Sequence, residues 1–280
     1  MTLLGAPVLK GPAVDCALQY KVDDLQREVG RLALLHSHDA LVFLRISLAM
    51  PKLLNTLRTS PCADNKLLTI LDSSLRDVLT TILNIDRTDD QWTHASLSIR
   101  NGGVGVSSAQ MLAPSAFLAS AAFTLPLQNA ILSPPLANVD DLDKAAALSS
   151  LKFLSHAEEP TELSRGIQKA WDGSVASVAQ SDLLSRAESS IDQVRLLSAC
   201  AEHSDDWMHA PPITAVGLRL NDEMVRISIA TRLGARACEP HTCPCGKDGG
   251  RKVTSWSILP EKCSQAYKTR APELLHMEGR

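Results

Sequence analysis

The feature that most constrains this chain is the spacing of its apolar residues, which recur every three or four positions over long stretches. Val22, Leu25, Val29 and Leu32 follow this spacing, and they predict an amphipathic helix over about residues 15–36. Leucine and alanine are abundant while aromatic residues make up only 4% of the chain, and this composition favours helix packing over a β-sandwich. The chain is therefore predicted to be mostly α, an irregular multi-helix bundle.

Two further helices are expected in the next fifty residues. The first covers about residues 39–59, and Pro51 should kink or split it because proline lacks a backbone donor. The second covers about residues 65–84, with Asp64 as its N-cap. Its buried stripe is expected to consist of four apolar residues at helical spacing: Leu71, Leu75, Val78 and Ile82.

Three glycines within four positions, Gly102, Gly103 and Gly105, demand backbone freedom and predict a turn. A phosphate-binding loop would follow a strand and open a helix at the anion, and no convincing strand precedes these glycines. A structural turn is therefore favoured over a phosphate cradle. Ser107 or Ser108 should cap the helix that follows.

The second half of the chain is also expected to be helical. A helix of small residues should run to Ala122. Pro114 and Pro126 interrupt the apolar stretch of this region and leave no run of about 18 apolar residues for a membrane span. Further helices are predicted near residues 142–156, 161–179, 182–203 and 218–233, with Asp141, Thr161 and Ser181 as caps of the first three. The lone histidines, His38 and His94 among them, are expected at caps and on the surface.

Seven cysteines, an odd number, and a first segment that does not make a signal peptide favour a reducing compartment, so an intracellular location is expected. Zinc requires four thiolate or imidazole ligands, and the candidate set is Cys238, His241, Cys243 and Cys245. The alternative is free thiols in a poorly ordered C-terminal tail. The sequence leaves both open, so the predicted cofactor is either none or zinc.

Several segments, taken in order, resemble one family. They lie at residues 4–8, 38–41, 50–62, 100–106, 112–120, 218–223, 232–235 and 240–246. Their order resembles the region that follows the polymerase palm in reverse transcriptases of non-LTR, LINE-like retrotransposons. The resemblance covers about residues 3–246, with MPKLLNTLRTSPC and RNGGVGV among its longer segments.

The resemblance implies a thumb that grips an RNA–DNA duplex by its backbone, which needs lysine and arginine near phosphates. Lys52, Arg58 and Arg100 are the candidates for this face. The implied partner is RNA or an RNA–DNA duplex, bound weakly, with no membrane involved. The palm with its metal-binding aspartates would precede Met1 and a nuclease would follow Arg280, so we expect a catalytically silent fragment that is not an enzyme.

Resemblance and composition together divide the chain into four regions. They are a thumb-like helical domain at 1–132, an acidic helical linker region at 133–204, a helix with a truncated Cys/His segment at 205–246, and an irregular tail at 247–280. The alternative function is a helical protein-interaction domain without a nucleic-acid role. In that case the apolar segment at 112–132 would be a surface awaiting a partner.

Overall fold

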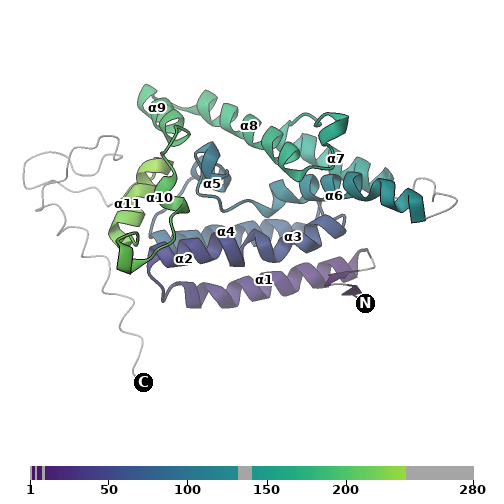
Figure 1. Cartoon of the computed structure of the whole chain (residues 1–280), viewed down its shortest axis with the longest axis horizontal. Helices are drawn as coiled ribbons and strands as arrows, with labels where there is room; N and C mark the ends of the chain where they lie inside the picture. Colours follow the sequence, from purple (N-terminus) through teal and green to yellow (C-terminus); the bar gives the residue numbers. More distant parts are fainter. Residues whose placement is uncertain (1, 4, 8–9, 132–140, 238–280) are drawn as a thin grey trace, which may run out of the picture.

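The computed structural model describes residues 2–3, 5–7, 10–131 and 141–237. These residues are mostly α-helical, as predicted. Figure 1 shows the helices stacked in layers, with α1 at the base and α8 across the top. Residues 132–140, at the start of the predicted linker region, and the predicted irregular tail lie outside the described residues.

The lower layer, a name used here for α1–α4, comes first in the chain. Its helices are α1 (Pro12–Leu32), α2 (Ser37–Phe43), α3 (Met50–Thr59) and α4 (Lys66–Leu83), and a π-helical turn, η1 (Leu44–Leu48), joins α2 to α3. A hairpin of two-residue strands, β1 (Thr2–Leu3) and β2 (Ala6–Pro7), precedes them. Because the hairpin is so small, the chain remains an α-helical protein.

The remaining elements lie above and beside the lower layer (Figure 1). In the middle are α5 (Asp89–Ser96), the 3-10 turn η2 (Ile99–Asn101) and α6 (Ala109–Ile131). The upper layer, a name kept for α7 and α8, consists of α7 (Asp141–Ser155) and α8 (Gln168–Arg186), with η3 (Glu162–Ser164) between them. At one end stand α9 (Ser190–Ala199), α10 (Asp206–His209), η4 (Thr214–Val216) and α11 (Asp222–Leu233).

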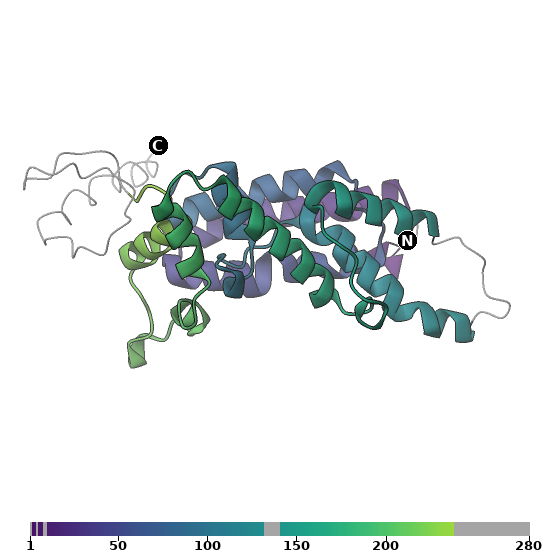
Figure 2. The same cartoon turned by 90° about the horizontal axis from the view of Figure 1, so that it is seen from above.

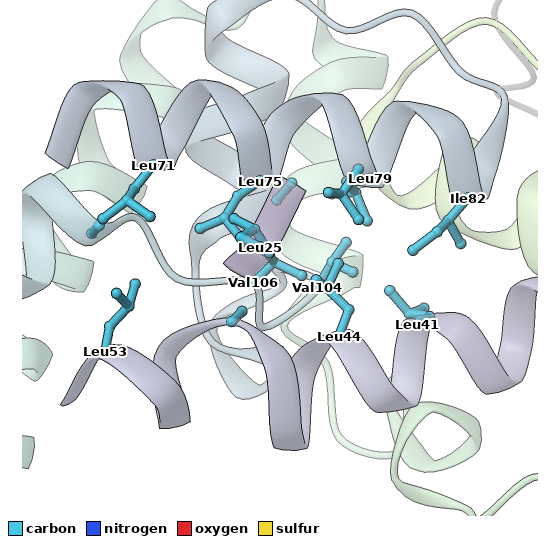
Figure 3. Close-up of a cluster of buried hydrophobic side chains, with 14 of the residues drawn as sticks. Leu25, Leu41, Leu44, Leu53, Leu71, Leu75, Leu79, Ile82, Val104 and Val106 are labelled. Carbon is cyan, nitrogen blue, oxygen red and sulfur yellow. The ribbon is translucent and has the colours of Figure 1, made fainter. Parts of the chain in front are cut away.

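The main hydrophobic core lies between α4 and the segment from α2 to α3. Figure 3 shows leucines of the two helical segments pointing toward one another, with Val104 and Val106 among them. The predicted stripe of α4 is confirmed, since its four residues are at most 4% exposed. Burial of a leucine or isoleucine side chain contributes roughly 1.5–3 kcal/mol, so this stripe alone fixes the position of α4.

The cap of α4 differs from the prediction by one residue. Asn65, not Asp64, caps the helix, because its side-chain oxygen accepts a hydrogen bond from the Leu67 N–H at 2.9 Å. The Asp64 carboxylate instead accepts a hydrogen bond from the Ser150 hydroxyl of α7. A tertiary contact has therefore replaced the local one that sequence predicted.

The predicted split at Pro51 is confirmed. Pro51 is the second residue of α3, where its missing N–H removes no helical hydrogen bond. The chain passes from α2 to α3 through η1, whose wider turn accommodates the change. The helix that begins after Pro12 was also predicted, although it ends at Leu32 instead of near residue 36.

Helix α6 is longer than predicted. Pro114 and Pro126 both lie inside the helix, which continues past Ala122 to Ile131. As a result α6, like the segment Ser37–Thr59, is long and apolar enough to cross a membrane by length and composition, a criterion that core helices of soluble proteins also meet. About a third of each window (33% for α6, 39% for the other) is buried within the protein.

The boundaries of the later helices also needed correction. Ser181 was expected to cap a helix, but it lies inside α8, which runs unbroken from Gln168 to Arg186. Ser189 caps α9 instead, where its hydroxyl accepts a hydrogen bond from the Asp192 N–H at 3.1 Å. Short helix α5 was not predicted, because six of its eight residues are polar and it shows no apolar stripe.

Helix α11 packs against the main hydrophobic core. Its buried residues Val225, Ile229 and Leu233 belong to the same hydrophobic cluster as the leucines of α2 and α4. A second, smaller cluster joins α6, α7 and α8 around Trp171. Trp171 is 3% exposed and is the largest side chain of this cluster, so it anchors α8 there. The four-region division of the sequence stays a prediction.

Candidate nucleic-acid interface

A cleft of about 1300 Å3 lies between α8 and the layer beneath it, which α4, α5, η2 and the start of α6 form. Figure 2 shows α8 crossing over that layer. Five cations line the cleft: Arg58, Arg76, Arg100, Lys169 and Arg186. Three acids also line it: Asp72, Asp172 and Asp182. Positive side chains therefore outnumber negative ones.

The three basic residues proposed from sequence do not lie together. Arg58 and Arg100 both line the cleft. Lys52 lies outside it, on the side of α3 that faces α1, where its ammonium group is 2.8 Å from the carboxylate of Asp24. This ion pair lowers the pKa of Asp24, first through the hydrogen bond from Lys52. The structure thus brings two of the three candidates to one site.

Three of the five cations are not engaged in ion pairs. Arg100 and Lys169 are exposed and make no hydrogen bond or ion pair to the described part of the chain through their side chains. Arg58 donates from two guanidinium nitrogens to the neutral amide oxygen of Gln168, at 2.7 and 3.0 Å. Their positive charges are therefore available to an anion. We call Arg58, Arg100 and Lys169 the cleft cations.

The other two arginines hold elements together. Arg76 donates to Asp89 at 2.6 Å and so links α4 to the first turn of α5. Arg186 donates to Asp90 at 2.5 Å and links the end of α8 to α5. Their charges are thus partly neutralised by carboxylates before any ligand arrives.

Asp72 is buried at the floor of the cleft. It accepts hydrogen bonds from the Ser108 hydroxyl and the Ala109 N–H, both at 2.5 Å, and from the Gln110 N–H at 3.3 Å. Burial raises the pKa of this carboxyl, and the three hydrogen bonds oppose the rise. Asp72 therefore holds the N-terminus of α6, together with Ser108, which was one of the two predicted caps.

Asp172 on α8 has a similar role. It accepts a hydrogen bond from the Ser115 hydroxyl of α6 at 2.6 Å and another from the Gln168 amide at 3.3 Å. Burial raises the pKa of Asp172, and these hydrogen bonds again oppose the rise. The positive charge of Arg58 also opposes the rise in the pKa of Asp172. This carboxyl group therefore offsets part of the positive charge of the cleft cations when it is ionised.

The glycine turn forms one wall of the cleft and is structural, as predicted. The N–H groups of Gly102, Gly103, Val104 and Gly105 each donate to a backbone carbonyl of residues 95–99 at 3.0 Å, so none is left to hold a phosphate. A Cβ at Gly103 would lie 2.0 Å from the Leu97 carbonyl oxygen. This close approach explains why glycine is required there.

Arg232 of α11 fixes the glycine turn, a role that was not predicted from the sequence. Its guanidinium donates to the carbonyl oxygens of Ile99 at 2.9 Å, Gly103 at 3.0 Å and Ser204 at 3.2 Å. The segments around residues 100–106 and 232–235 both contributed to the family resemblance, and here they touch. Only a tertiary structure could show this, because the two lie 129 or more residues apart.

The segments at residues 38–41 and 218–223, which also carried the resemblance, touch as well. Arg219 forms an ion pair with Asp39, and the Leu220 N–H donates to the Nδ1 atom of His38 at 3.1 Å. His38 is 1% exposed, so its expected place at a cap or on the surface was wrong. It serves as a buried acceptor that ties the α11 segment to α2.

His94 is buried too, contrary to expectation. Burial, followed by the nearby charges of Arg195 and Arg232, lowers its pKa to about 3. The Nδ1 atom lies 3.4 Å from the Arg195 guanidinium. The ring is therefore neutral at physiological pH, and it packs beside the glycine turn as a structural group.

The zinc candidates Cys238, His241, Cys243 and Cys245 lie outside the described residues. Within residues 10–131 and 141–237, no three side chains of the metal-binding types lie close enough together to hold an ion. No protein-family model, curated protein or solved structure matches the chain. Function is therefore inferred from the cleft and from the sequence resemblance.

Proposed function

We propose that this chain is a catalytically silent, thumb-like helical module that grips an RNA–DNA duplex by its sugar–phosphate backbone. The observation that supports this most is the position of Arg58 and Arg100. The resemblance selected them from distant parts of the sequence, and both line one cleft together with Lys169. Backbone contact by such cations is independent of base sequence.

The strength of the grip follows from the number of available cations. Neutralising Z phosphates gives a slope of about −0.9Z in the logarithm of the binding constant against the logarithm of salt concentration, so three contacts give a slope of about −3. Binding of this kind is weak at physiological salt and strengthens steeply at low salt. It also needs no reaction step, which fits a module without catalysis.

The test is a salt series of fluorescence anisotropy with a labelled blunt RNA–DNA hybrid. Arg100→Gln and Lys169→Gln should each weaken binding uniformly across sequences and reduce the salt slope by about 1. Lys52→Gln is the matched control, because it removes the same charge from outside the cleft. Undetectable binding at low salt, or an equal loss with Lys52→Gln, would contradict the proposal, as would primer extension by the purified chain alone.

A second candidate function, docking of a protein partner, is favoured by one observation. The last two turns of α6 expose Phe123, Leu127 and Ile131, each more than 60% accessible, on a helix without a charged residue. Such a surface is typical of an interaction site. Light scattering after size exclusion tests it: a mass that stays at 30.2 kDa for the wild type and for Leu127→Asp would remove self-association from this candidate.

A further inference from the structure

We infer that the interior of the cleft binds an unpaired strand adjoining the duplex, with one base stacked on Trp92. This rests on the proposed function, because the same cleft cations would hold the phosphates of that strand. It goes further by naming the form of nucleic acid that enters the cleft and the side chain that receives a base.

The size of the cleft suits a single strand of nucleic acid and not a double helix. Its volume of about 1300 Å3 exceeds the ~300–1,000 Å3 of pockets that enclose drug-sized ligands, so a few linked nucleotides have room. A double helix does not fit, because one turn is ~34 Å long and carries two backbones with stacked pairs between them. A duplex can touch the cleft cations only from the rim, whereas one strand can lie inside the cleft.

Trp92 is placed to receive a base. It is half-buried, packs against the main core and also lines the cleft. Its helix is held rigidly, since Thr88 and Gln91 form a capping box at the start of α5. The Gln91 side chain also donates to the Gly234 carbonyl at 2.9 Å. An aromatic ring fixed in this way loses little entropy when a base stacks on it.

The groups around Trp92 suit the rest of a nucleotide. Ser96, Ser98 and Asn101 line the same cleft with hydroxyl and amide groups that suit sugar and base edges. Arg100 lies within the η2 turn and supplies a positive charge for phosphate. A cationic groove with an aromatic stacking platform is the combination that single-strand-binding proteins use.

The experiment compares two labelled ligands on the full chain: the blunt hybrid, and the same hybrid with an unpaired extension of about six nucleotides, within the range of known single-strand sites. Stacking of one base is worth about tenfold in affinity, so the extended hybrid should bind about tenfold tighter than the blunt one. Trp92→Leu should abolish this advantage and leave binding of the blunt hybrid unchanged. Trp92→Phe, which retains a ring, should keep most of it.

A second measurement avoids substitutions in a residue that also contacts the core. Photocrosslinking of a 4-thiouridine in the extension to the wild-type protein should label the peptide that contains Trp92. Equal affinity for blunt and extended hybrids, or labelling only of other peptides, overturns this inference while the backbone grip stands. Loss of all hybrid binding at low salt removes the proposed function and this inference with it.

Discussion

The lower and upper layers of this molecule are held by different forces. The lower layer is joined through leucines, with Leu68, Leu71, Leu75 and Leu79 of α4 fully buried against its neighbours. Helix α8 of the upper layer is joined to the elements beneath it by two smaller apolar clusters, one around Trp171 and one around Leu183, and by polar contacts. These contacts are Ser115–Asp172, Arg58–Gln168 and Arg186–Asp90.

This difference indicates which part of the molecule is rigid and which part can move. Buried leucines contribute kilocalories each, whereas an exposed ion pair contributes ~0–1 kcal/mol. Helix α8 should therefore separate from the layer beneath at a lower free energy than global unfolding requires. The cleft lies at this weaker junction, so a ligand can enter it without disturbing the core.

The largest expected effect tests the strength of the lower layer. Leu75→Ala should lower the free energy of unfolding by about 2–5 kcal/mol, because Leu75 is 0% exposed and the cavity left behind cannot collapse fully. Urea unfolding followed by circular dichroism measures this. Leu163→Ala is the control, since Leu163 is 98% exposed and should change stability by less than about 0.5 kcal/mol. Equal losses of unfolding free energy in the two variants would show that the buried leucines are not what stabilises the lower layer.

Arg232 extends the comparison of the two layers, because it makes polar contacts within the part of the molecule that the leucine core holds rigid. Arg232→Met should destabilise the protein by about 2–4 kcal/mol, since three carbonyl oxygens lose their donor and remain largely buried. The same urea titration detects it. A loss below about 1 kcal/mol would mean that water satisfies the three carbonyl oxygens once the guanidinium is removed. Burial would then not explain why some polar contacts contribute more to stability than others.

The sequence predicted the lower layer well because periodicity is a local signal. The stripe of α4 and the split at Pro51 both follow from residues near one another in the chain. The later helices were harder. Pro126 lies within a continuous helix, and Ser181 within another, because packing of α6, α7 and α8 outweighs such local preferences.

The candidate site was predictable only in part. Arg58 and Arg100 came from the family resemblance, and the cleft contains both. The roles of Lys169 and Arg232 gave no signal, because they depend on where α8 and α11 lie in the tertiary structure. The Arg58–Gln168 contact spans 110 residues and the Arg232–Ile99 contact 133, and no spacing rule reaches that far.

Acid should lower the free energy of unfolding through His94. The folded pKa is about 3 and the ordinary value is 6.5, so below pH 6.5 the unfolded chain binds a proton that the folded chain does not. Stability should therefore fall as pH is lowered, by about 2 kcal/mol between pH 6.5 and 5 from this residue alone. Urea unfolding at several pH values measures the slope.

His94→Gln isolates that contribution, because a neutral side chain should flatten the slope over the same window. Asp72 and Asp172 act in the opposite sense: their pKa values are raised by burial, so the stability that they contribute is greatest at low pH and is lost as pH rises. Both acids remain in the variant, so their effect cancels in the difference. An unchanged slope in His94→Gln would show that the ring is not kept neutral by burial.

The smallest expected effect is the most direct test of the two-layer comparison. Ser115→Ala removes the 2.6 Å hydrogen bond to Asp172 and should cost about 1 kcal/mol. Because α8 opens before the core does, amide hydrogen exchange should accelerate in α8 about fivefold and remain unchanged in α4. Thr124→Ala is the control, since the Thr124 hydroxyl bonds within α6 alone. If exchange in α4 rose equally with that in α8, the two layers would open as one unit, and the cleft would then be as rigid as the leucine core beneath it.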